Sequence, residues 1–144
     1  MARKHPYHAF RFRVEFDSVQ HGGFTRVKGL SRETKVESRR EGGVNDFEHK
    51  LATQTTYPNL VLERGLVDPY LWGWHEDVID AADAKGVKRR TVTIVLQDEA
   101  GDEAWRWLVA DAFPVKWTGT DLDGANGQVL VESVELAHHG IKKG

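Results

Sequence analysis

The sequence predicts a mainly β protein in which two antiparallel sheets form a small barrel or sandwich with one α-helix beside them. Three observations support this fold class. Segments in which apolar and polar residues alternate recur along the chain, as half-buried strands require. Glycine pairs and acidic turns separate these segments. Only one stretch, about 68–84, has the spacing of an amphipathic helix. At 144 residues, we expect a single domain over 1–144.

Composition narrows the classes of function. Hydrophobic residues make up 40% and charged residues 29%, and the formal net charge is -2. Such a balance provides no long-range attraction for nucleic acid or anionic membranes. The absence of cysteine excludes disulfides, thiolate metal sites and cysteine nucleophiles. No segment approaches the roughly 20 apolar residues of a spanning helix, so we expect a soluble protein made in the cytoplasm, without direct membrane insertion.

The first strands are expected before residue 31. Tyr7 to Phe16 alternates between an aromatic face and a charged face, which predicts a half-buried strand. Gly22-Gly23 ends it, and Phe24 to Leu30 is predicted to be the returning strand. Gly29 indicates a bulge or a close approach of two backbones.

A charged segment follows. From Glu33 to Glu41, alternate residues carry charges of alternating sign, which fits either a solvated sheet face or a wetted channel wall. Gly42-Gly43 then opens a polar stretch that ends near Pro58. This stretch is either a surface loop or an arm, about 42–57, that reaches a neighbouring subunit, because long loops in compact domains usually have a function.

The helix has clear boundaries in the sequence. Asn59 to Arg64 is a short strand that Gly65 ends. Asp68 is a good N-cap, and Pro69 suits the first helical position. Lys85-Gly86 provides a stop. The inward stripe comprises Leu71, Trp74, Val78 and Ala82.

The C-terminal half returns to strands. Glu103 to Ala112 has features of both helix and strand, but the preceding turn and the spacing of Trp105 and Trp107 favour a strand. Pro114 predicts a kink or an edge. The remaining predicted elements are a strand at Val87 to Gln97, a hairpin turn at Asp98 to Asp102, strands at Val115 to Leu122 and Gln128 to His138, and a basic tail at 140–144.

Catalytic patterns are scarce, so we expect no enzyme, cofactor or metal site. His138 and His139 are adjacent on a predicted strand and point to opposite faces, and no zinc-protease spacing occurs. The carboxylate pairs flank a turn, where acidic residues are common. No serine lies in a nucleophile elbow, and no glycine-rich phosphate loop is present. The five tryptophans are better explained by core and subunit contacts than by a stacking platform for ligands.

Several motifs occur in an order that resembles the tail tube proteins of contractile phages and of phage-tail-like injection systems. The resemblance spans nearly the whole chain. Its motifs are Gly29-Leu30, Glu41-Gly42-Gly43, Asn59 to Gly65, Trp72, Trp107, Ala112 to Trp117, and Glu135 to His138. The chain departs from the family pattern at His139, where an acidic residue is frequent, and at Asn126-Gly127, where the order is often reversed.

The resemblance implies a structural role. Six copies would form a ring, and stacked rings would form a hollow tube for protein effectors or DNA, with sheath and baseplate proteins as partners. It implies channel-facing positions at Lys35, Glu37, Arg39, Thr91 and Thr93. It implies inter-subunit contacts from Glu41, Gly42, Gly43, Phe47, His49 and Tyr57. A tube-initiator protein at the baseplate is an alternative, and a small β-barrel ligand carrier is an alternative of another class.

Overall fold

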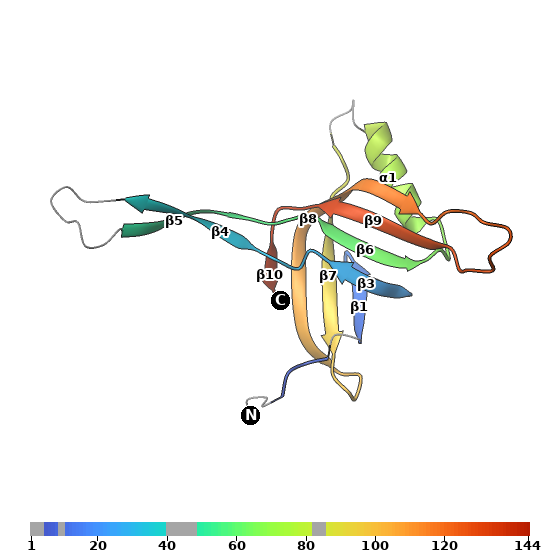
Figure 1. Ribbon diagram of the computed structural model, residues 1–144, viewed down its shortest axis with the longest axis horizontal. Coiled ribbons are helices and arrows are strands. Elements are labelled where there is room, and N and C mark those ends of the chain that lie inside the picture. Colours follow the sequence, from blue (N-terminus) through green and yellow to red (C-terminus); the bar gives the residue numbers. More distant parts are fainter. Residues whose placement is uncertain (1–4, 9–10, 40–48, 82–85) are drawn as a thin grey trace.

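The computed structural model describes residues 5–8, 11–39, 49–81 and 86–144. Within these ranges it contains one helix and ten strands (Figure 1). Their bounds are β1 Phe12–Phe16, β2 Val19–His21, β3 Phe24–Lys28, β4 Glu33–Arg39, β5 His49–Thr56, β6 Leu60–Gly65, α1 Tyr70–Ala81, β7 Arg90–Gln97, β8 Glu103–Gly119, β9 Val131–Ala137 and β10 Ile141–Lys143. The mainly β class with one helix is therefore confirmed.

Eight strands form one strongly bent antiparallel sheet in the order β2-β1-β7-β8-β9-β6-β3, with β10 also paired to β8. The 17-residue strand β8 belongs to both halves of this sheet, because its first half pairs with β7 and its second half with β9. Predicting two strands separated at Pro114 was wrong. The register shifts between Pro114 and Lys116, so the proline sits at a bulge that bends a continuous strand. The predicted tail also contains a strand, β10.

The core lies inside the bend of this sheet. Strand β6 alternates buried and half-buried residues along its length, and β9 alternates in the opposite phase. The period of two predicted from the sequence thus places one face of each strand inward. The fully or nearly buried apolar residues are Val14, Phe16, Leu60, Leu62, Leu71, Trp74, Val92, Ile94, Val95, Val109, Ala112, Val134, Leu136 and Ile141.

The partner of the first strand differs from the prediction. Asp17 and Ser18 adopt φ angles of 49° and 70°, the left-handed pair that a tight two-residue hairpin uses. Residues 19–21 therefore return as β2 and pair with β1. Phe24–Lys28 instead pairs with β6, at the other end of the sheet.

Helix α1 starts where the sequence indicates. The Tyr70 N–H donates to Asp68 Oδ1 at 2.9 Å, so Asp68 is the cap, and this bond is the main reason that the Asp68 pKa is lowered. Leu71 and Trp74 are buried, and Trp74 Nε1 donates to Lys88 O at 3.1 Å. The helical residues run from Tyr70 to Ala81, directly after the predicted Asp68-Pro69 start, and residues 82–85 lie outside the described ranges.

A buried ion pair joins β6 to β9. Arg64 and Glu132 are opposite each other in the register and both are 0% exposed. Arg64 Nε donates to Glu132 Oε2 at 2.8 Å, and its Nη2 donates to Asp68 Oδ1 at 2.8 Å. Trp117 Nε1 donates to the other Glu132 oxygen at 2.8 Å. Because every charge has a partner, this network can fix the register of the two strands and the start of α1.

Candidate assembly surfaces

Strands β4 and β5 form an arm that projects away from the rest of the molecule (Figure 1). We call this two-stranded sheet the arm. The described residues 33–38 and 49–55 are all exposed, and the arm makes no extensive contact with any other described element. Thr34 and Thr55 share a 2.8 Å hydroxyl contact across its strands. A two-stranded hairpin by itself is only marginally stable in water, so the described part of the arm gains little stability beyond its joint to the body.

The arm continues the β3–β6 pair. Lys28 pairs with Val61 before the joint, and Glu33 pairs with Thr56 beyond it. Residues 49–56, predicted to belong to a polar loop, are thus a strand. Strand β5 has no apolar face, because nearly all of its residues are exposed. Its pairing with β4, and not its hydrophobic pattern, defines it as a strand.

The joint between arm and body is tightly held. Gly29 has a φ of +95°, and a Cβ there would lie 2.3 Å from Asn59 O, so the predicted close backbone approach is confirmed. Asn59 Nδ2 donates to Glu135 Oε2 at 2.8 Å. These contacts tie the root of the arm to β9.

His138 closes the same joint. Its Nε2 lies 2.9 Å from Pro58 O, and its Nδ1 accepts the Gly140 N–H at 3.1 Å. These partners assign a neutral ring that carries its hydrogen on Nε2. The Tyr57 ring packs edge-on against it, with centroids 5.8 Å apart. His138 is therefore a structural clamp.

The five predicted channel-facing residues lie in two places. Lys35, Glu37 and Arg39 are on β4 in the arm, whereas Thr91 and Thr93 are on β7 in the main sheet. The protomer thus does not bring them together. Thr91 is exposed, but Thr93 is 4% exposed and has little surface to offer a channel.

The predicted arm contacts are partly described. Glu41, Gly42, Gly43 and Phe47 lie outside the described residues. His49 begins β5 opposite Arg39, and Tyr57 lies at the root, packed against the core instead of on the projecting part.

A charged sheet face surrounds Thr93 on β1, β7 and β8. Arg13 pairs with Glu15 at 3.0 Å and with Glu103 at 3.7 Å. Arg106 hydrogen-bonds to Glu103 at 2.5 Å, which lowers the pKa of that carboxyl. We call Arg13, Glu15, Glu103 and Arg106 the charged ladder. The sequence showed alternation at Arg13 and Glu15, but only the pairing of β1, β7 and β8 reveals a continuous face.

The described residues contain no cluster of three or more side chains suited to hold a metal ion. Within those ranges, no helix has the length and apolar character that crossing a bilayer demands.

The profile of a known family matches almost the whole chain. The family is described as T4-like virus tail tube protein gp19, and it matches residues 8–142. The chain belongs to this tail tube family. The function expected from the residue motifs, a structural subunit of the inner tube of a contractile injection apparatus, is thereby confirmed. No curated sequence matches this tail tube protein significantly.

Solved structures share its fold. A chain in the baseplate of the anti-feeding prophage is 29% identical with a TM-score of 0.77, covering 98% of this chain and 97% of that one. A chain in the tube-terminating cap of the same particle is 25% identical with a TM-score of 0.84, covering 100% and 94%. A chain of the sheath-tube complex of the extracellular contractile injection system PVC is 24% identical with a TM-score of 0.82, covering 98% and 93%.

Proposed function

We propose that six copies of this tail tube protein form a ring and that rings stack into a conduit, with each arm seated on a neighbouring copy. One observation carries the proposal: the arm is exposed along its described length, whereas its joint to the body is held by Gly29, Asn59 and His138. The joint fixes the direction of this hairpin, while its exposed residues remain available for contact. Such a hairpin is suited to bind the surface of a second protein. In the described part of the chain, β2, β3 and β10 each have an edge without a strand partner, and these edges provide further surfaces for pairing.

The charged ladder and the exposed Thr91 supply the wall of the conduit in this proposal. Their charges are mixed and already paired within the protomer, so a passing protein or nucleic acid meets no strong field of one sign. The role is passive and non-enzymatic. In this proposal Lys35, Glu37 and Arg39, which lie on the arm, contact the neighbouring copy. They line the channel only if the arm itself forms part of the channel wall.

The arm contact is tested by surface substitutions that spare the body. Val36 and Leu51 are 58% and 45% exposed on the arm, so Val36→Asp with Leu51→Asp leaves the folded protomer intact. We expect rings and tubes of the wild type by negative-stain microscopy and none of the double variant. Ile79→Asp, on the exposed side of α1 at 60%, is the matched control and assembles normally. Normal tubes from the arm variant would refute the arm contact.

The channel wall is tested by thiol labelling, because the chain has no native cysteine. Thr91→Cys in assembled tubes reacts with a small maleimide but not with a maleimide coupled to a polymer too wide for the channel. Glu76→Cys, exposed on α1, reacts with both. Equal labelling of Thr91→Cys by both reagents would place this face on the outside.

The similarity to a baseplate chain favours one alternative, a tube initiator at the baseplate. The two roles differ in self-assembly. A tube subunit adds rings to its own rings and gives long tubes, whereas an initiator gives single rings.

A further inference from the structure

A hollow of about 220 Å³ lies beside the arm root, between β8, β10 and the segment that joins β3 to β4. We call it the tryptophan hollow. It is lined by Leu30, Ser31, Arg32, Trp105, Trp107, Ile141, Lys142 and Lys143. Its volume lies below the roughly 300–1,000 Å³ of a typical small-molecule site, so it suits one or two side chains.

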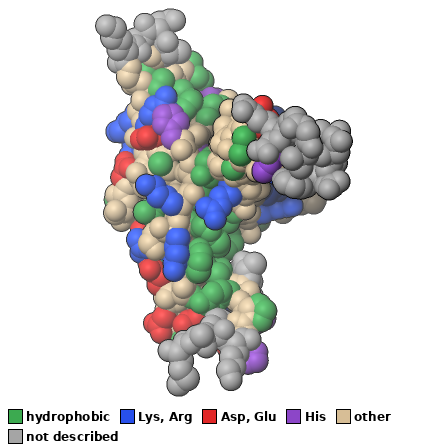
Figure 2. Space-filling model, turned by 90° about the vertical axis from the view of Figure 1, so that its left-hand side faces the viewer, with side chains coloured by type: hydrophobic (Ala, Val, Ile, Leu, Met, Phe, Trp, Pro, Cys, Tyr) green, Lys and Arg blue, Asp and Glu red, His purple; other side chains and the backbone are tan. Residues whose placement is uncertain are grey.

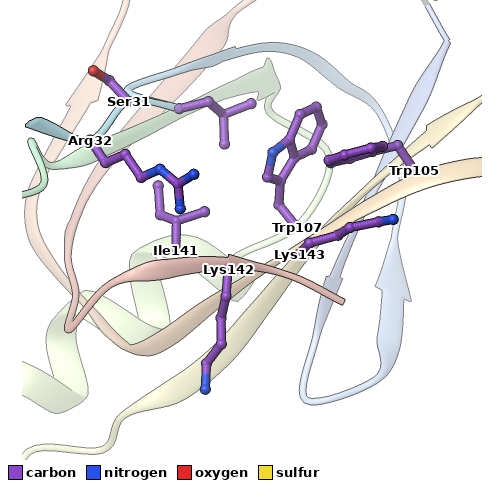
Figure 3. Close-up of a pocket in the computed structure, with 8 residues that line it drawn as sticks. Ser31, Arg32, Trp105, Trp107, Ile141, Lys142 and Lys143 are labelled. Atoms are coloured by element: carbon purple, nitrogen blue, oxygen red, sulfur yellow. The ribbon is translucent and has the colours of Figure 1, made fainter.

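The hollow combines apolar side chains with cations: Arg32 lines it, and Lys143 Nζ lies 4.5 Å from the centroid of the Trp105 ring. Figure 3 shows the Arg32 guanidinium extending toward Ile141 and Trp107, whereas Lys142 points away. Among the described residues Arg32 has no ion-pair partner. Within the same ranges, Trp105 Nε1 is buried without a hydrogen-bond partner. The hollow therefore offers apolar side chains and a guanidinium that has no ion-pair partner among the described residues.

Figure 2 shows the side of the molecule that faces left in Figure 1. Hydrophobic side chains gather down its middle, and Lys and Arg side chains flank them. Exposed apolar patches bordered by charge are common at protein contacts. An occupant of this surface should combine an apolar tip with negative charge.

The β8–β9 loop, residues 120–130, carries that combination. Leu122 is 86% exposed, and it lies between Asp121 and Asp123. The loop is ordered, since Asp123 Oδ1 accepts the Ala125 N–H at 3.0 Å and Thr120 N donates to Val131 O at 3.0 Å. Leu122 shares this ordered loop with Val129, which is 75% exposed, and it extends furthest into water. Such a side chain is suited to insertion into a hollow lined by apolar residues and cations.

A copy cannot fill its own hollow. In Figure 1 the β8–β9 loop lies at the right-hand end, whereas β10, one wall of the hollow, lies on the opposite side of the main sheet. A contact between two different patches is heterologous, and it produces rings or stacked filaments instead of closed pairs.

We propose that Leu122 of one copy inserts into the tryptophan hollow of the next, with Asp121 pairing to Arg32. This inference deepens the proposed tube function and rests on it. Leu122 packs against the apolar side chains, and the Asp121 carboxylate meets the Arg32 guanidinium, which has no ion-pair partner in the described part of the chain. The other acidic turn, residues 98–102, lacks a large apolar residue and makes a poorer occupant.

Cysteine cross-linking tests the contact in assembled protein. A disulfide needs Cα atoms within about 7 Å, so Leu122→Cys with Ser31→Cys reports proximity between copies. We expect oxidised tubes to give a ladder of linked chains on a denaturing gel. The matched control, Glu99→Cys with Ser31→Cys, gives single chains. Unlinked chains from oxidised Leu122/Ser31 tubes would overturn the proposal.

A charge exchange provides a second measurement. Arg32→Glu should raise the protein concentration needed for assembly by about tenfold or more, because it faces Asp121 with a like charge. Adding Asp121→Arg should restore assembly to within about threefold of the wild type. Arg32 and Asp121 are both exposed, so neither substitution should disturb folding. The control is the thermal unfolding of the variant protomers, which should match that of the wild type. No rescue by the exchange counts against the pairing.

The two proposals fail differently. Wild-type protein that forms no rings contradicts the tube assembly itself. Wild-type tubes that form without the cross-link, and a Leu122→Ala variant that assembles at the wild-type concentration, contradict only the insertion of Leu122.

Discussion

Removing one member of the buried Arg64–Glu132 pair should be the most damaging single substitution outside the apolar core. Arg64→Met keeps much of the side-chain volume. Among the described residues it leaves Glu132, which is 0% exposed, with the Trp117 hydrogen bond alone. Breaking a buried pair from one side costs about 3–5 kcal/mol, because the remaining charge is uncompensated. Native domains are stable by about 5–15 kcal/mol in total. The variant should therefore lose a large share of its stability.

The assay is reversible urea unfolding of the protomer, followed by tryptophan fluorescence and far-UV circular dichroism. The midpoint should fall with an unchanged slope if the folded state keeps its compactness. Arg26→Met is the matched control on the adjacent strand. Its side chain is 62% exposed and lies 3.6 Å from Glu63, so its loss should cost no more than about 1 kcal/mol.

The double variant Arg64→Met with Glu132→Leu separates charge from packing. Replacing both partners by apolar residues removes the uncompensated charge, and such replacements are often neutral or stabilising. We expect the double variant to regain at least about half of the loss. An Arg64→Met variant that loses less than about 1 kcal/mol, or a double variant no better than either single one, would refute the argument.

Three further predictions concern the joint and the helix start. Gly29→Ala should destabilise the protein by more than about 1 kcal/mol in urea unfolding, because its φ is +95° and the new Cβ meets Asn59 O at 2.3 Å. His138→Phe should speed hydrogen exchange of the arm amides, because it removes the hydrogen bond to Pro58. Burial, above all, lowers the pKa of His21, so the unfolded chain binds more protons and stability should fall as the pH drops below about 6.5. His21→Phe should flatten that part of the pH curve of melting temperature.

The glycine and His138 predictions each have a neighbouring control. Gly22→Ala meets nothing within 4 Å and should change stability little. His139→Phe removes exposed contacts with Asp111 and Arg89 that lie away from Pro58, so the arm should exchange as in the wild type. Equal effects at Gly29 and Gly22, equal exchange in both histidine variants, or an unchanged pH curve for His21→Phe would contradict the respective predictions.

Local pattern was sufficient to predict much of the fold. The alternation around Val14 and Phe16, the Asp68 cap and the strand character of Trp105 and Trp107 are all observed. These signals depend on residues close together in the sequence, so they can be detected without knowing which strands pair. Pairing partners are not local, which is why residues 24–28 were assigned to the wrong neighbour and pair with β6.

The assembly surfaces were harder to predict because their signals are polar. Strand β5 is exposed along nearly its whole length and its partner β4 is highly charged, so neither has the apolar face by which a strand is usually detected. The tryptophan hollow joins residues near 31, 106 and 142, which lie far apart in the sequence. The β8–β10 pairing brings the last two of these segments together, and the segment between β3 and β4 completes the lining.

Strands β3, β4, β5 and β6 form one continuous hairpin. Its half nearest the body is well supported, and its outer half is not. The β3–β6 half is held against β9 by the Arg64–Glu132 pair, and the joint is closed by Gly29 and His138. The β4–β5 half has no comparable support in the described residues. A rigid root gives the arm a defined direction, so little orientational freedom remains to be lost when a neighbour binds. The β8–β9 loop lies at the end of the body opposite the arm. Under the proposed assembly, every copy that joins the tube therefore exposes the same two contact surfaces to the copy that follows.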